Sequence, residues 1–281
     1  MLKKSEISLP AGLIEATSPT LSARIGRQAS EGAPIAVFAA LFVIWELACR
    51  YGGVPRWLLP APSLIISEMW TAREAIPGHI WVTLVEVLAG FFVAVVVGVP
   101  LSVLIVLSPF VRKITYPVLV MLQSVPKVAL APIILLWIGY GPSSKVLIAA
   151  VTAFFPIIVN TTTGLQAVPD ELLQLARSLE APTLKVFRKV RLPFAMPFIF
   201  SAMKVSMALS LIGAVVGEFV GANRGLGYLI LAYSSTMNTA MVFGAIVLLA
   251  LMGILLFYAV CAAERVLCPW YAASGASDRV L

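Results

Sequence analysis

The stretch AVPDELLQLARSLEAPTLKVFRKVRLP, residues 167–193, decides the fold because it predicts two short helices held between long apolar blocks. Pro169-Asp170-Glu171 is typical of a helix start, since proline suits the first turn and acids favour the positive end of the helix dipole. The apolar residues of 172–179 then recur at spacings of three and four, so they share one face. Glu180-Ala181-Pro182 breaks this helix, and a second helix with a basic face follows and ends at Leu192-Pro193.

An amphipathic helical hairpin of this kind needs a surface on which to bury its apolar faces. The lipid headgroup layer is one such surface, and a basic face would suit it. A groove on a cytoplasmic protein is the other. The residues alone leave both open. Because the hairpin is tied to an apolar block at each end, a force on it would move the blocks.

Outside the hairpin, the chain is dominated by apolar blocks long enough to cross a membrane. Of its 281 residues, 60% are hydrophobic and only 12% are charged, which is about half the charged share of soluble proteins. A bilayer core needs roughly 20 apolar residues in a helix. We therefore predict an all-α integral membrane protein with about six transmembrane helices, over residues 34–50, 80–107, 115–138, 146–166, 193–220 and 241–263.

The basic residues are distributed unevenly over the predicted loops. If the N-terminus is cytoplasmic and six spans alternate, 13 of the 20 Lys and Arg residues fall on the cytoplasmic side and five on the opposite side. This positive-inside bias predicts cytoplasmic tails over 1–33 and 266–281, flanking a membrane domain over 34–265. The net charge of +7 does not indicate a nucleic-acid partner, because no basic patch interleaved with aromatic residues is present. Three cysteines without a C-x-x-C spacing and a single histidine argue against a disulfide framework or a zinc site.

Five ionisable side chains fall within the predicted spans, where the cost of burying charge in lipid makes them candidates for function. They are Glu46, Glu86, Lys127, Lys204 and Glu218. The first four lie near predicted span ends, where snorkelling to the membrane surface would account for them. Glu218 lies towards the external end of the fifth span, and we expect it to line an outer gate or to meet an interfacial or intersubunit partner.

Small and polar residues mark two further candidate positions. Gly213, Gly217 and Gly221 make two G-x-x-x-G steps on one helix face, which lets another helix approach closely. The approaching helix could belong to a second subunit, beside the solute pathway, or to the same chain. Asn160, followed by threonines at 161–163, could line an inner vestibule or bond back to its own helix.

The hairpin resembles the E-A-A-x-x-x-G-x9-I-x-L-P motif of permease subunits in binding-protein-dependent ATP-binding cassette (ABC) importers. The spacing is kept over 174–180 and 190–193, with nine residues between them. Ala176, Leu192 and Pro193 match the motif and Val190 is a conservative change, whereas Gln174, Leu175 and Glu180 replace its acid, alanine and glycine.

Glu180 bears on how the turn between the two helices is built. The glycine of the motif normally allows a tight turn there. Glutamate suits that place only if the backbone avoids positive φ, and Pro182 pushes Ala181 towards extended geometry. We therefore expect a turn that differs from the usual one.

Shorter stretches, at 124–132, 153–161, 217–219 and 225–228, are similar to the branch that includes nitrate, sulfonate, taurine and pyrimidine-precursor permeases. The resemblance covers roughly residues 34–270. It implies the type I ABC importer permease fold in a bacterial inner membrane, with 167–193 as coupling helices between spans four and five. The residues that it implies contact an ATPase are Gln174, Ala176, Arg177, Ser178, Glu180, Lys185, Arg188, Leu192 and Pro193.

The same resemblance implies the other parts of a transporter. Two permease copies, a homodimer, would form the solute pathway in the bilayer. Two separate ATPase subunits would bind ATP and Mg, and a periplasmic or lipid-anchored binding protein would deliver the solute. The solute would be a small nutrient, such as an organic anion or a heteroaromatic compound.

The sequence contains no recognisable nucleotide-binding or catalytic motif. The nearest approach to a P-loop, at 139–145, lacks the G-K-[ST] ending, and neither G-x-S-x-G nor H-E-x-x-H occurs. We therefore expect a transport subunit, not an enzyme, with no cofactor in this chain. The alternative is an ion-gradient-driven secondary transporter, against which the sequence shows no inverted repeat of broken helices.

Overall fold

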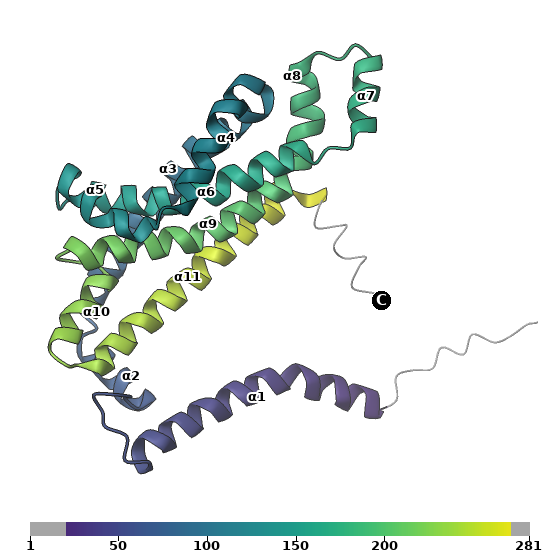
Figure 1. Cartoon of the computed structure of the whole chain (residues 1–281). Coiled ribbons are helices and arrows are strands. Elements are labelled where there is room, and N and C mark those ends of the chain that lie inside the picture. Colours follow the sequence, from purple (N-terminus) through teal and green to yellow (C-terminus); the bar gives the residue numbers. More distant parts are fainter. Residues whose placement is uncertain (1–20, 271–281) are drawn as a thin grey trace, which may run out of the picture. The chain divides into compact units, whose positions relative to one another are not determined.

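The computed structural model describes residues 21–270, which are helical over most of their length and contain no β-strand (Figure 1). The chain divides into two compact units, with the boundary between Val54 and Pro55. Most of the two predicted tails, residues 1–20 and 271–281, lies outside the described residues. The elements are α1 (Leu21–Tyr51), α2 (Pro62–Thr71), α3 (Ile76–Leu107), α4 (Pro109–Ser124), η1 (Lys127–Leu130), α5 (Ala131–Ile138), α6 (Pro142–Gln166), α7 (Asp170–Ser178), α8 (Thr183–Val186), η2 (Phe187–Arg191), α9 (Leu192–Gly221), α10 (Leu226–Ser235) and α11 (Thr239–Leu267).

The first unit contains the single long helix α1. Its 31 residues would extend about 46 Å, which is enough to cross a bilayer core. It begins 13 residues before the predicted start at 34, so the helix extends into what the sequence indicated as a tail. Large apolar side chains such as Phe38, Leu41 and Ile44 are exposed along it, as expected of a helix that meets lipid or another membrane helix.

The second unit is built around α6, which packs against both α3 and α9. Small residues let these helices approach closely: a Cβ added at Gly90 would overlap Ala149, and one at Gly164 would overlap Phe198. Serine hydroxyls join the helices further, since Ser206 donates to the Ala153 carbonyl and Ser210 to the Val87 carbonyl, both at 2.8 Å. Among the described residues, four helical stretches are long and apolar enough to span a membrane, namely α3, α6, Thr183–Gly221 and α11. The all-α membrane fold is thus confirmed.

The predicted third span, 115–138, is wrong as one continuous helix. The chain forms α4, leaves the helical path at Val125 and Pro126, makes the 3₁₀ turn η1, and then forms the eight-residue α5. Proline has no N–H to donate and restricts the residue before it to extended geometry, so Pro126 ends α4. An apolar block therefore shows that a segment is buried in lipid or protein, but not that it is one helix.

The hairpin of residues 167–193 forms as predicted at its start and differs at its end. Helix α7 begins at Asp170, with Asp170 and Glu171 in the first turn. The second helix does not stop at Leu192-Pro193, because α8 runs through the π-helical stretch η2 directly into α9. In that wider turn the Leu192 N–H bonds to the Phe187 carbonyl five residues back, which carries the chain past the proline that could not continue an α-helical pattern.

The turn between α7 and α8 is the usual glycine type, although glutamate occupies it. Glu180 has φ of 49°, in the left-handed region. The Glu180 N–H bonds to the Arg177 carbonyl at 2.9 Å, and the Ala181 N–H bonds to the Ala176 carbonyl at 3.0 Å. These two bonds define a Schellman ending, in which the left-handed residue is normally glycine. The expectation of a differently built turn is therefore wrong.

Replacing Glu180 by glycine is expected to stabilise the protein. The left-handed conformation costs an L-residue about 1–2 kcal/mol, and the greater freedom of glycine in the unfolded chain offsets about 0.4–1 kcal/mol of that. The expected gain is about 0.5–1 kcal/mol, measured as an increase in the thermal unfolding midpoint in detergent. Glu180→Val is the matched control, because a β-branched side chain suits this φ least. A Glu180→Gly protein that unfolds earlier than the Glu180→Val protein would show that the turn is not strained.

Candidate functional site

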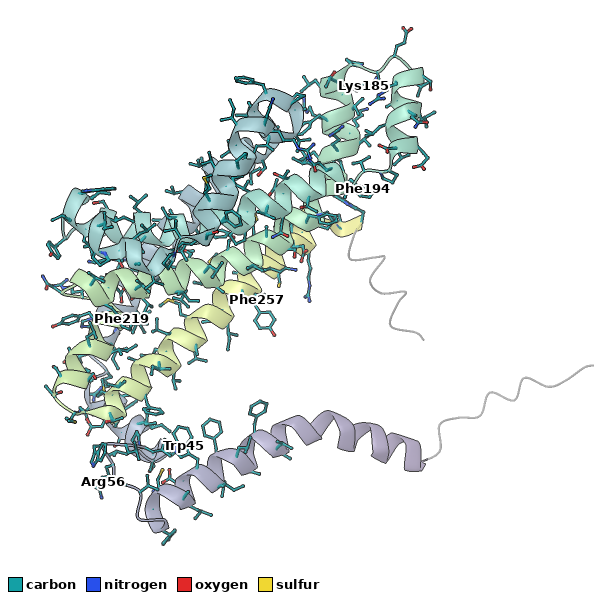
Figure 2. All side chains as sticks on the ribbon, in the orientation of Figure 1. Trp45, Arg56, Lys185, Phe194, Phe219 and Phe257 are labelled. Carbon is teal, nitrogen blue, oxygen red and sulfur yellow. The ribbon has the colours of Figure 1, made fainter. Side chains whose placement is uncertain are left out.

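The hairpin of α7 and α8 stands at one end of the second unit, beyond the ends of α6 and α9 (Figure 1). Its apolar side chains have little cover from the rest of the chain: Leu175 is 56% exposed, Leu179 71% and Leu184 68%. Between the two helices lies an open groove of about 800 Å³, which we call the hairpin groove. Figure 2 shows Lys185 on α8 and Phe194 at the base of the hairpin, and both line this groove.

The residues predicted to contact an ATPase all lie on or beside this hairpin. Those that line the hairpin groove are Ala176, Glu180, Lys185 and Pro193. Those that do not line it are Gln174, Arg177, Ser178, Arg188 and Leu192. Ser178 donates to the Leu175 carbonyl at 2.9 Å, so its hydroxyl helps to end α7. Sequence reasoning missed Phe194 and Trp270, which also line the groove. No spacing pattern relates Trp270, three residues after the end of α11, to a hairpin about 80 residues earlier.

Three buried charges meet at the other end of the helices. Glu86 on α3 is 2% exposed, Lys145 on α6 is 6% exposed, and Glu218 on α9 is 1% exposed. Lys145 Nζ lies 3.7 Å from Glu86 Oε1, and Glu218 accepts a hydrogen bond from Thr83, which lies one turn before Glu86 on α3. We call these three residues the buried charge cluster. The charge count assigned Lys145 to the external loop at 139–145, whereas the structure places it on α6, which begins at Pro142. Glu86 was expected to snorkel from a span end, but it is buried among the helices.

Glu218 holds the start of helix α10. Its carboxylate accepts hydrogen bonds from the Thr83 hydroxyl at 2.6 Å and from the Gly227 N–H at 2.5 Å. The Leu226 N–H donates to Thr83 Oγ1 at 2.8 Å, and the Gly225 N–H donates to His79 Nδ1 at 3.0 Å. Three successive N–H groups at the positive end of α10 are thus satisfied by side chains of α3 and α9. A Cβ at Gly225 would overlap the Glu218 carboxylate, which is why glycine stands there.

The other ionisable side chains of the predicted spans also have partners within the described chain. Glu46 forms an ion pair with Arg50 one turn later. The Lys204 ammonium on α9 lies 2.5 Å from the Glu264 carboxylate on α11. The Lys127 ammonium lies 5.2 Å from the centre of the Phe155 ring, which is a cation–π contact. Within residues 21–270, no cluster of three or more His, Cys, Asp or Glu side chains could hold a metal ion.

The glycine face of α9 packs within the chain. A Cβ at Gly213 would overlap Ala149 of α6, one at Gly217 would press on Lys145, and one at Gly221 would overlap Tyr140. Of the two alternatives for these glycines, close packing inside one chain is what the structure shows. Asn160 donates to the Pro156 carbonyl at 3.0 Å, so its amide bonds back to its own helix.

The matching family is described as "Binding-protein-dependent transport system inner membrane component", and its profile covers residues 87–270. The chain belongs to this family. As a member, it is a multi-pass membrane permease, which agrees with its apolar helices. Together with the exposed hairpin, this makes the residues 167–193 the first candidate for a functional surface of the permease.

Relatives with assigned roles resemble the permease over most of their length. The formylaminopyrimidine transport permease protein ThiX of Halalkalibacterium halodurans is 36% identical over 84% of this chain and 95% of its own. The riboflavin transport system permease protein RibX of Chloroflexus aurantiacus is 35% identical over 86% of this chain and 90% of its own. Among solved structures, an inward-facing MetNI methionine ABC transporter matches with a TM-score of 0.62 and 22% identity, over 70% of this chain and 97% of that chain. This last match shows the type I importer permease fold.

Proposed function

We propose that this permease takes up a small organic solute by means of ATP hydrolysis in a separate ATPase that binds the hairpin of α7 and α8. The observation that carries the proposal is the large exposed fraction of Leu175, Leu179 and Leu184 on the two helices of the hairpin. A soluble partner with an apolar groove would bury them. The spacing of the motif across 174–193 and the family of binding-protein-dependent transporters support the same partner.

The rest of the proposed assembly follows from the same family. Two copies of the permease form the solute pathway, two ATPase subunits bind ATP and Mg, and a periplasmic or lipid-anchored binding protein delivers the solute. The excess of basic residues on one side supports cytoplasmic termini in a bacterial inner membrane. Relatives named for formylaminopyrimidine, riboflavin, aliphatic sulfonates and taurine favour an organic anion or a heteroaromatic compound as the solute.

Co-purification of the permease with a co-expressed candidate ATPase subunit tests the proposal. Arg177→Glu with Arg188→Glu is expected to dissociate the ATPase and to lower ATP-driven uptake at least about tenfold, because exposed charges steer and orient association. The matched control is Arg56→Glu with Arg224→Glu, two exposed charges at the other end of the unit, which is expected to leave the complex intact. Normal ATP-driven uptake by a protein lacking residues 171–190 would exclude the proposal. Uptake by the permease alone, driven by an ion gradient, would favour a secondary transporter.

A further inference from the structure

A hollow of about 670 Å³ lies between α4 and α6, at the end of the helices that leads to the hairpin. We call it the α4–α6 hollow. Arg112 and Lys113 of α4 stand on one side, and Thr162, Thr163 and Gln166 of α6 stand on the other. Its inner wall is apolar, since Ile105, Leu119 and Ile158 pack together there as a buried cluster.

The charges around the α4–α6 hollow all have one sign. No Asp or Glu of residues 21–270 lines it. Neither Arg112 nor Lys113 has an ion-pair partner within the part of the chain that the structure describes, and both side chains are exposed. Two cations beside a low-dielectric wall concentrate anions locally.

A buried hydroxyl without a partner adds an independent reason to expect a ligand. Thr163 bonds back to the Val159 carbonyl at 2.9 Å, as threonines in helices commonly do. The neighbouring Thr162 lines the hollow, and its hydroxyl oxygen is buried with no hydrogen-bond partner. Leaving such a group unsatisfied is costly. Rotation of the half-buried Thr162 side chain would turn its hydroxyl into the hollow, where an acceptor atom on a bound molecule would satisfy it.

We propose that the α4–α6 hollow binds a small amphiphilic anion. Its sulfonate, carboxylate or phosphate group lies against Arg112, Lys113 and the Thr162 hydroxyl, and its apolar body lies against Phe155 and Ile158. The volume is in the usual range for small-molecule sites, and a bare inorganic oxyanion would fill only a small part of it. The anion can come from either of two sources. If it is the transported solute near its exit, the proposal rests on the proposed function. A phospholipid headgroup is the other source, because it carries the same anionic chemistry.

The charge of the hollow is measured with a cysteine at Thr163. The full chain, with Cys49, Cys261 and Cys268 replaced by alanine, is placed in phosphatidylcholine nanodiscs without the ATPase. We expect 2-sulfonatoethyl methanethiosulfonate to label Thr163→Cys about tenfold faster than the trimethylammonioethyl reagent, relative to a free thiol. Arg112→Gln with Lys113→Gln should remove this preference. Arg177→Gln with Arg188→Gln, a matched removal of two charges on the hairpin, should keep it.

Protection by a ligand identifies the source of the anion. Pentanesulfonate is expected to slow labelling in phosphatidylcholine nanodiscs, and Thr162→Val should raise the concentration required about five- to tenfold, because one charge-assisted hydrogen bond is lost. Protection that appears only when phosphatidylglycerol replaces phosphatidylcholine would assign the same site to a lipid headgroup. Equal labelling by both reagents, or a preference that survives without Arg112 and Lys113, would overturn the proposal. Labelling needs no ATP, so a failure to couple with the ATPase is a separate outcome.

Discussion

Lys145→Met is expected to destabilise the permease by about 3–5 kcal/mol, because it leaves Glu86 and Glu218 buried without a cation. Methionine nearly keeps the volume of the lysine stem, so lost packing contributes little to the effect. For a chain of this size the thermal unfolding midpoint should fall on the order of 10 °C. Thermal unfolding of the detergent-solubilised protein, followed by tryptophan fluorescence, measures the change.

A second substitution distinguishes charge from packing in this result. Adding Glu86→Gln to Lys145→Met removes the carboxylate that Lys145 pairs with. It should recover much of the lost stability, because the remaining Glu218 carboxylate keeps its hydrogen bonds from Thr83 and Gly227. Lys204→Met is the matched control. Its partner Glu264 is partly exposed, so water screens the charge that is left and the loss should be smaller. A Lys145→Met protein as stable as the wild type, or a double variant no better than the single, would contradict this account of the buried charge cluster.

Leu175→Asp with Leu179→Asp should abolish coupling without unfolding the permease. Both side chains are exposed in the free chain, so aspartate there costs the fold little. If the ATPase buries them, each aspartate must be desolvated in an apolar interface, and interface positions of this kind contribute about 2 kcal/mol or more. We expect the affinity for the ATPase, and the ATP-driven uptake by proteoliposomes, to fall at least about 30-fold.

The control for the leucine pair is Met237→Asp. Met237 is also a large exposed apolar residue, but it lies between α10 and α11, away from the hairpin. It should change neither ATPase binding nor the unfolding midpoint. Wild-type ATPase affinity in the leucine variant would show that the partner binds elsewhere. A lowered unfolding midpoint in that variant would show that the leucines pack within the permease.

The sequence indicated the apolar helices and the hairpin because both depend on local periodicity. It could not show how the charges pair. Charge counting placed Lys145 in a loop by its distance from an apolar block, whereas its burial depends on the register of α3, α6 and α9. The backbone conformation at Glu180 was predicted from the steric preference of a single residue, but the hydrogen bonds of the whole turn determine its φ. Pro126 was accepted inside a span because membrane helices often tolerate proline, and here it ends one.

Helix α9 joins the two candidate regions as one mechanical part. At its first residue it continues α8 and η2, and near its last residue Glu218 accepts a hydrogen bond from the start of α10. The helix is 30 residues long, about 45 Å, which is long enough to connect the two surfaces of a bilayer. If the hairpin end is the pivot, a tilt of about 5° displaces the Glu218 end by about 4 Å. A small rotation of α9 at the hairpin end would therefore displace the start of α10, at the opposite end, by more than the length of a hydrogen bond.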